Sequence, residues 1–259
     1  MAPLKGSKMS IFRKISSAIM MTALSFTLAA CAINPKDPVN ADTTSVSDPL
    51  KPFNKVMLSI NEFLDKVLFN PIDTAYRTVV PEVARNGVHN VLENVKSPVY
   101  LANELLQGDL DGAGKVVTRF TINTLLGVGG IIDQAGNSGI TNAPEDFGQT
   151  MAVWGVPNGP YIVWPIFGPS TLRDSVGIVG DIAMDPLYWY ARNNDKTGLQ
   201  YTRAGLTLVD TKHKYRGTMD DLRRNSGDLY TSLQSVYLQR RNALINDSSS
   251  KKASLPEME

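Results

Sequence analysis

A run of 26 consecutive residues without a charge, from Phe147 to Leu172, constrains the fold most strongly. A membrane-spanning helix needs about 20 apolar residues, so this run is long enough to span. It nevertheless contains four glycines and four prolines, and proline removes backbone donors and breaks helices. We therefore do not expect one continuous transmembrane helix. Non-helical backbone at membrane depth requires surrounding protein or a cavity beside it.

The same region is rich in aromatic residues. All three tryptophans of the chain lie between Trp154 and Trp189, and tryptophan and tyrosine favour the headgroup level of a bilayer. Two interpretations stay open: an aromatic wall or rim that meets lipid, or an aromatic loop packed against helices. The wall or rim would be formed by Trp154, Tyr161, Trp164 and Phe167.

The remainder of the folded part has mostly helical spacing. Pro71 and Pro81 can each occupy a first helical turn, and Ser97 followed by Pro98 predicts a further helix start. Other expected signals are caps at Asp111 and Ser170, stops at Gly108 and Gly127, a short extended segment over 161–164 and a final helix over 229–244. A first helix would present one face formed by Phe53, Met57, Ile60, Leu64 and Leu68. We expect an all-α, mainly helical single domain with an aromatic loop region rich in glycine and proline.

The first thirty residues have the pattern of a secretory signal. Four basic residues precede the uncharged, mostly apolar segment 15–28, and small residues follow. A single-span anchor is the alternative, but the segment is short for a bilayer. The sequence Leu28–Cys31 (LAAC) resembles the bacterial lipobox, which makes Cys31 the expected lipid anchor. Ala32, in place of aspartate, favours the inner leaflet of the outer membrane as the destination.

The composition divides the chain into four parts. We expect a lipoprotein signal peptide over 1–30, a flexible lipidated tether over 31–47, one helical domain over 48–245 and a disordered tail over 246–259.

Enzyme, metal and nucleic-acid functions find little support. With 26 basic and 25 acidic residues the net charge is +1, which gives no reason to expect nucleic-acid binding. One cysteine and two histidines exclude Cys-rich and most His-based metal clusters. Gly112–Lys115 resembles part of a P-loop, but Asp109 and Val116 stand where glycine and a hydroxyl residue are required. We expect no enzyme, cofactor or metal; a lipid hydrolase would need a serine or aspartate within reach of His89 or His213.

Several segments, taken together and in order, resemble the MlaA/VacJ lipoprotein family. The resemblance is collinear from about residue 48 to residue 241. Pro157–Asn158 and Trp164 depart from its pattern. The matching segments are Asp48–Asn54, Ala84–Gly87, Leu106–Gly108, Arg119–Gly130, Glu145–Thr150, Trp154–Val156, Gly159–Tyr161 and Phe167–Asp174.

This resemblance implies a role in lipid traffic. Such proteins form a ring of helices in the inner leaflet of the outer membrane, with a central amphipathic channel. They remove misplaced phospholipid from the outer leaflet and pass it to a soluble periplasmic carrier. They associate with trimeric porins and are not enzymes. An alternative function of another class is a structural lipoprotein that braces a porin without handling lipid.

The resemblance and the local sequence suggest site residues. We expect the helix over 53–68 to seal the channel, with Phe53 and Asn54 setting how it docks, although Phe53 has core packing as an alternative. Close backbone approach or a hinge is expected at Gly127, Gly129 and Gly130. Arg173 either meets a lipid phosphate or pairs with Asp174.

Overall fold

The computed structural model describes residues 48–253, with side chains to residue 246. The expected signal peptide, the tether with Cys31 and the last residues of the tail lie outside these described residues. The helices are α2 (Lys51–Leu64), the π-helix η2 (Asp65–Phe69), α3 (Asn70–Val79), α4 (Glu82–Gln107), α5 (Leu110–Leu125), α6 (Gln134–Asn137), α7 (Phe147–Val153), α8 (Leu172–Met184), α9 (Pro186–Asn193), α10 (Thr197–Asn225) and α11 (Leu229–Ala253). The two strands are β1 (Tyr161–Trp164) and β2 (Gly168–Thr171).

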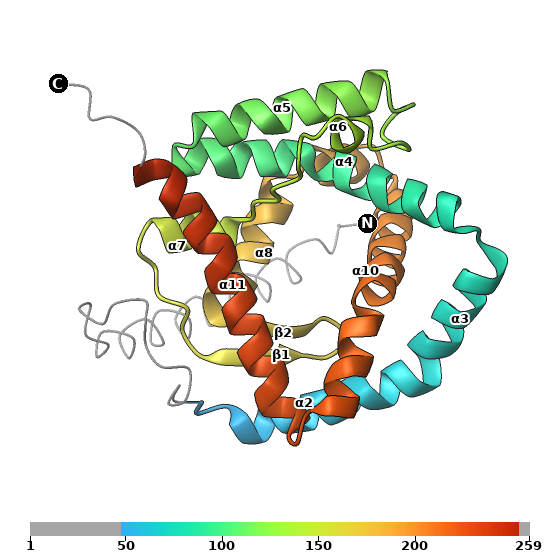
Figure 1. Cartoon of the computed structure of the whole chain (residues 1–259), viewed down its shortest axis with the longest axis vertical. Coiled ribbons are helices and arrows are strands. Elements are labelled where there is room, and N and C mark those ends of the chain that lie inside the picture. The colour runs from blue at the N-terminus through green and yellow to red at the C-terminus, as the bar shows by residue number, and fades with distance from the viewer. Residues whose placement is uncertain (1–47, 254–259) are drawn as a thin grey trace, which may run out of the picture. The chain divides into compact units, whose positions relative to one another are not determined.

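The helices are arranged around a central space. Figure 1 shows α2, α3 and α4 following one another around the periphery, with α5 lying along α4. Helices α10 and α11 form a V whose point lies beside α2, and the β1–β2 hairpin lies near them (Figure 1). The expectation of a mainly helical fold is confirmed, with one small antiparallel sheet that pairs Tyr161 with Thr171.

A small apolar core lies where α2, the hairpin and the α10–α11 junction meet. Tyr161 and Tyr230 pack edge to face, with ring centroids 6.0 Å apart. The buried members of this core are Leu58, Tyr161, Val163, Tyr230 and Leu233. Its location explains why the hairpin is held firmly although it contains only two short strands.

Of the helix starts predicted at Pro71 and at Ser97–Pro98, the one at Ser97–Pro98 was wrong. Pro98 lies inside α4 rather than at a helix start. The loss of one backbone donor there is outweighed by the packing of this 26-residue helix along α5, α7, α8 and α10. Pro71 does lie in the first turn of α3, but no break precedes it, because the π-turn of η2 joins α2 to α3.

Smaller differences concern caps and ends. The cap of α5 is Asp109 rather than Asp111, and the cap of α8 is Thr171 rather than Ser170, each through a side-chain oxygen that accepts a backbone N–H. Gly108, with φ of +77°, ends α4 as expected. The extended segment at Tyr161–Trp164 is confirmed as β1, whereas β2 was not predicted. Helix α11 continues past residue 245 to Ala253.

Within residues 48–253, no helix combines the length and the apolar character needed to cross a membrane.

Candidate functional site

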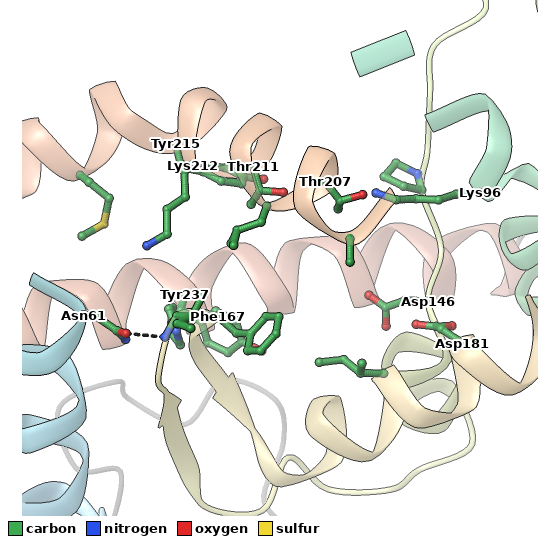
Figure 2. A pocket seen from close by; sticks show the side chains of 18 of the residues that line it. Asn61, Lys96, Asp146, Phe167, Asp181, Thr207, Thr211, Lys212, Tyr215 and Tyr237 are labelled. Carbon is green, nitrogen blue, oxygen red and sulfur yellow. Dashed lines mark hydrogen bonds between the residues drawn. The ribbon is translucent and has the colours of Figure 1, made fainter. Parts of the chain in front are cut away.

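The space between the helices is a cavity of about 1000 Å³. Its walls come from α2, η2, α3, α4, α7 and the segment before it, the hairpin, α8, α9, α10 and α11. Figure 2 shows side chains from several of these elements, Lys96, Asp181, Thr211 and Tyr237 among them, around this space. Segments that are distant in the sequence therefore contribute to one hollow interior.

The cavity wall carries equal numbers of acidic and basic residues, seven of each, next to apolar side chains. Such a lining suits a ligand that has both charges and hydrocarbon. The acidic residues are Glu62, Asp65, Asp73, Glu145, Asp146, Asp181 and Asp185. The basic residues are Lys96, Arg203, Lys212, Arg216, Arg223, Arg240 and Arg241. The apolar residues include Leu58, Phe69, Val163, Phe167, Ile178, Leu187, Leu208, Met219 and Leu233.

Ion pairs on one side of the cavity join α10 to η2 and α3. Asp65 of η2 lies 2.7 Å from Lys212 Nζ and 2.8 Å from an Arg223 guanidinium nitrogen. Asp73 of α3 pairs with Arg216 and His213. Burial alone would raise the pKa of Asp73, but hydrogen bonds from Arg216 and His213 outweigh it, so this pKa lies below its usual value. These contacts fix the long helix α10 against the peripheral helices.

A second polar cluster lies where α7, α8 and α11 meet. Arg241 of α11 binds Asp146 through two nitrogens, at 2.6 and 2.5 Å, and lies 3.0 Å from Asp174. Asp181 accepts hydrogen bonds from the Asn103 side chain at 3.0 Å and from the Phe147 backbone at 2.9 Å. Among the described residues, Asp181 has no cation in an ion pair. Burial raises the pKa of Asp181 to about 6, against the effect of the Phe147 hydrogen bond and with a further contribution from the nearby Asp146 charge.

Two asparagines of α2 bind the free edge of β1. Asn54 is completely buried; its amide nitrogen donates to the Tyr161 carbonyl and its oxygen accepts from the Val163 N–H, both at 2.9 Å. Asn61, seven residues later on the same helix face, donates to the Trp164 carbonyl at 2.9 Å and accepts from the Ile166 N–H at 2.6 Å. The second of these bonds is drawn in Figure 2. The side chains thus replace a neighbouring strand.

The residues expected at the seal separate into two kinds. Asn54 holds α2 to the hairpin, whereas Phe53 is 45% exposed, so the alternative of core packing for Phe53 was wrong. The buried face of α2–η2 consists instead of Asn54, Leu58, Asn61, Asp65 and Phe69. The apolar stripe of this helix faces outward because the polar stripe makes the internal contacts.

The glycine turn after α5 lies away from α2, on the opposite side of the molecule in Figure 1. A side chain at Gly127 would collide with the Ile132 and Asn123 carbonyls, and one at Gly130 with the Asn94 side chain. Gly129 and Gly130 have φ of +71° and +95°, which favours glycine. The expected close backbone approach is therefore present, but between α4 and α5 rather than at the seal; the hinge stays a prediction.

Of the four aromatic residues expected at a wall or rim, only Phe167 lines the cavity. Its side chain is 79% exposed, and Trp154 and Trp164 are also exposed. Tyr161 is instead buried in the apolar core, with 1% of its surface exposed. The rim role stays a prediction for the exposed three.

Arg173 is buried and lies 3.0 Å from Asp174 in an ion pair. It is not part of the cavity lining. This geometry agrees with the pairing interpretation, and a contact with a lipid phosphate stays a prediction.

The two histidines each have an aspartate partner. His89 Nδ1 lies 2.8 Å from Asp210, and His213 Nδ1 lies 2.7 Å from Asp73. An aspartate therefore lies within reach of each histidine, as the hydrolase alternative requires, whereas over residues 48–246 no serine or threonine hydroxyl hydrogen-bonds to either ring. No group of three or more potential metal ligands occurs in the part of the chain that the structure describes.

Sequence reasoning missed most of the charged lining. The basic residues of α10 lie on a helix that lacks a strongly apolar face. Its sequence pattern therefore resembles that of an ordinary solvent-exposed helix. One available signal was the recurrence of Asn54, Asn61 and Asp65 on the face of α2–η2 opposite its apolar stripe. A helix with a polar face toward the protein and an apolar face outward indicates an apolar environment.

Comparisons with known proteins agree with this architecture. The MlaA lipoprotein family model matches residues 46–244. The intermembrane phospholipid transport system lipoprotein MlaA of Escherichia coli K12 is 34% identical over 239 residues, covering 90% of this chain and 89% of the relative. The protein of the same name from Haemophilus influenzae is 31% identical, covering 84% and 89%.

A solved structure gives the same result. It comes from work on the structural basis for maintenance of bacterial outer membrane lipid asymmetry, and it is similar to this chain with a TM-score of 0.68. The two are 33% identical, and the match covers 78% of this chain and all of the solved one. On the family match and these relatives, the chain belongs to the MlaA lipoprotein family.

Proposed function

We propose that this protein is an outer-membrane lipoprotein of an intermembrane phospholipid transport system and that it maintains lipid asymmetry. In this proposal it takes phospholipid from the outer leaflet, passes the headgroup through the cavity and delivers the lipid to a soluble periplasmic carrier. It performs no catalysis. Its membrane position is the inner leaflet, with the acylated Cys31 as anchor and a trimeric porin as neighbour.

One observation carries this proposal: the charged and apolar lining of the cavity lies inside a shell whose outer face is apolar. A phospholipid headgroup cannot cross hydrocarbon cheaply, because burying unpaired charge costs several kcal/mol or more. A lining with seven acidic and seven basic residues, many of them in ion pairs with one another, is a polar environment for both charges of a zwitterion. The relatives named for phospholipid transport support the same ligand class.

The α2 helix is the seal of the passage in this proposal. Its two asparagines bind the hairpin, and the hairpin places Phe167 on the cavity. Deletion of Phe53 and Asn54 would remove half of this attachment and shift the remaining helix register. We expect lipid then to flow in the wrong direction, so that cells expose phospholipid at the surface and become sensitive to detergent.

The alternative function is a structural lipoprotein that braces a porin and handles no lipid. The hollow, charged interior argues against it, because bracing requires only an outer surface. The test is purification of the full-length lipoprotein from bacterial membranes in mild detergent, with mass spectrometry of the bound lipid and proteins. Phospholipid together with a porin supports transport, whereas porin without phospholipid supports bracing.

A further inference from the structure

Helix α9 separates the cavity from a second, smaller hollow. Tyr188 and Ala191 of this helix line the cavity, while Pro186 and Tyr190 line the smaller hollow. Leu187 lines both. Leu187 is therefore part of the wall of both spaces.

The smaller hollow is an apolar groove of about 340 Å³ between α4, α5 and α9. No charged side chain lines it; its residues are Val95, Pro98, Phe120, Pro186, Leu187 and Tyr190. Pro98 is the proline inside α4, and it presents a ring instead of a backbone donor. Phe120 and Tyr190 are exposed, so the groove is reachable from outside the protein. Its chemistry suits a hydrocarbon chain.

A cation lies beside the groove. Lys196 Nζ is 2.9 Å from the Tyr190 hydroxyl oxygen and 5.0 Å from the centroid of its ring. Arg192, on the same segment, reaches the Tyr188 hydroxyl at 3.2 Å. Within residues 48–246 neither Lys196 nor Arg192 forms an ion pair with a carboxylate. An apolar groove flanked by a cation without a carboxylate partner matches a phosphate joined to an acyl chain.

We propose that the α4–α5–α9 groove binds a phospholipid of the surrounding membrane, with an acyl chain against Phe120 and the phosphate on Lys196. The lipid lies next to the cavity, behind Leu187. This inference deepens the proposed function, on which it rests for the membrane setting, by adding a site on the outer wall for a lipid of the surrounding leaflet, separate from the cavity.

The test uses the full-length lipoprotein in vesicles of phosphatidylethanolamine and phosphatidylglycerol. The probe is a phosphatidylglycerol with a diazirine in the middle of one acyl chain. After irradiation, mass spectrometry maps the adducts on peptides, and adducts on the exposed face of α2 give the membrane background. We expect groove peptides containing Phe120 or Tyr190 to be labelled above that background.

Two pairs of variants make the test specific. Phe120→Glu should lower groove labelling about tenfold, because a carboxylate opposes hydrocarbon, whereas Val117→Glu, exposed one turn earlier on α5, should not. Lys196→Gln should lower it about threefold through loss of a charged contact, while Lys214→Gln, exposed on α10, should not. The surface substitution Lys196→Gln keeps the test valid if Phe120→Glu fails to fold.

The outcomes separate this inference from the proposed function. Labelled cavity peptides of α10 and α11 with background labelling in the groove would overturn the groove site and leave transport standing. Labelled groove peptides that respond to Lys196→Gln, with an unlabelled cavity, would support the groove site and count against transport. The site would also be overturned if groove labelling in the Phe120→Glu and Lys196→Gln variants equalled that of the wild type.

Discussion

The peripheral α2–α3 arm and the central helix α10 distribute polarity in opposite ways. Along the arm, large apolar side chains point outward and polar ones make the internal contacts; the exposed residues are Phe53, Val56, Ile60, Phe63, Val67, Leu68, Ile72 and Val79. Helix α10 buries no residue completely, and three of its basic residues, Lys212, Arg216 and Arg223, line the cavity in ion pairs with the arm. Ion-paired side chains therefore face the cavity together with a small apolar core, whereas the outer face of the arm is apolar.

This difference shows which environment each surface meets. In water the hydrophobic effect favours apolar side chains inside. An outward apolar stripe on successive helices is stable where the surrounding medium is itself apolar, as in one leaflet of a membrane. The charged interior then needs either ion pairs or water, and both are available in a cavity of this size. Four substitutions, ordered by expected effect on the free energy of unfolding, test this contrast.

The largest effect is expected at the junction of arm and hairpin. Asn54→Ala leaves the Val163 N–H and the Tyr161 carbonyl without their buried partner, which should lower the free energy of unfolding by about 3 kcal/mol. Unfolding in detergent, followed by circular dichroism, measures it. Asn86→Ala, at an exposed position of α4, is the control. An unchanged stability for Asn54→Ala would mean that the hairpin does not depend on α2.

The next effect concerns the ion pairs that join α10 to the arm. Asp65→Asn removes the partner of Lys212 and Arg223 in a partly buried site and should cost about 2 kcal/mol. Asp221→Asn breaks an exposed pair with Arg224 and should cost less than about 0.5 kcal/mol. Equal losses for the two variants would contradict an interior position for Asp65.

A pH dependence is expected from Asp181. Its folded-state pKa of about 6 exceeds the value of about 3.9 in the unfolded chain, so between these values the folded state binds more protons. The free energy of unfolding should therefore fall by up to about 2 kcal/mol as the pH rises from about 4 to 6, and then level off. Asp181→Asn keeps an acceptor for Asn103 and Phe147 and should abolish this contribution. If the free energy of unfolding changed with pH in the same way for the wild type and for Asp181→Asn, this prediction would be wrong.

Substitutions on the outward apolar face of the α2–α3 arm should have the smallest effect on the free energy of unfolding. They should nevertheless clearly weaken membrane binding. Phe63 is 63% exposed, so Phe63→Glu should change the free energy of unfolding in detergent by less than about 0.5 kcal/mol. The same change should weaken flotation with phospholipid vesicles in a protein whose proposed lipid anchor has been removed by Cys31→Ala. Phe63→Leu serves as the apolar control. Equal flotation of all three proteins would show that this face does not meet lipid.

The sequence predicted the class of elements better than their connections. Helical spacing, Gly108 and the extended segment at 161–164 were sufficient for a mainly helical fold because these signals are local. The uninterrupted passage of α4 through Pro98 could not be predicted, since packing along the whole helix decides it. The second strand, Gly168–Thr171, contains glycine and proline and gains its pairing only from β1.

The site was predicted less completely than the fold. Asn54 was identified together with the family resemblance, but its partners on β1 are more than a hundred positions away in the chain. The lining of α10 depends on the same long-range folding: Lys212 meets Asp65 across 147 positions. Arg173 was singled out for its charge, yet the cations that reach the cavity lie on α10 and α11. Which charges share a cavity is a property of the tertiary structure.

The central claim is that phospholipid headgroups pass through the cavity. Thr207 and Thr211 of α10 line it (Figure 2), so a protein with both Thr207→Trp and Thr211→Trp has a partly filled cavity and an unchanged outer face. Thr202→Trp, on an exposed part of the same helix, is the control. The measurement is phospholipid in the outer leaflet of cells that carry each variant as their only copy, at equal membrane abundance. We predict accumulation to the level of cells without the protein for the filled variant and wild-type levels for the control; a filled variant that keeps the outer leaflet free of phospholipid would contradict the account.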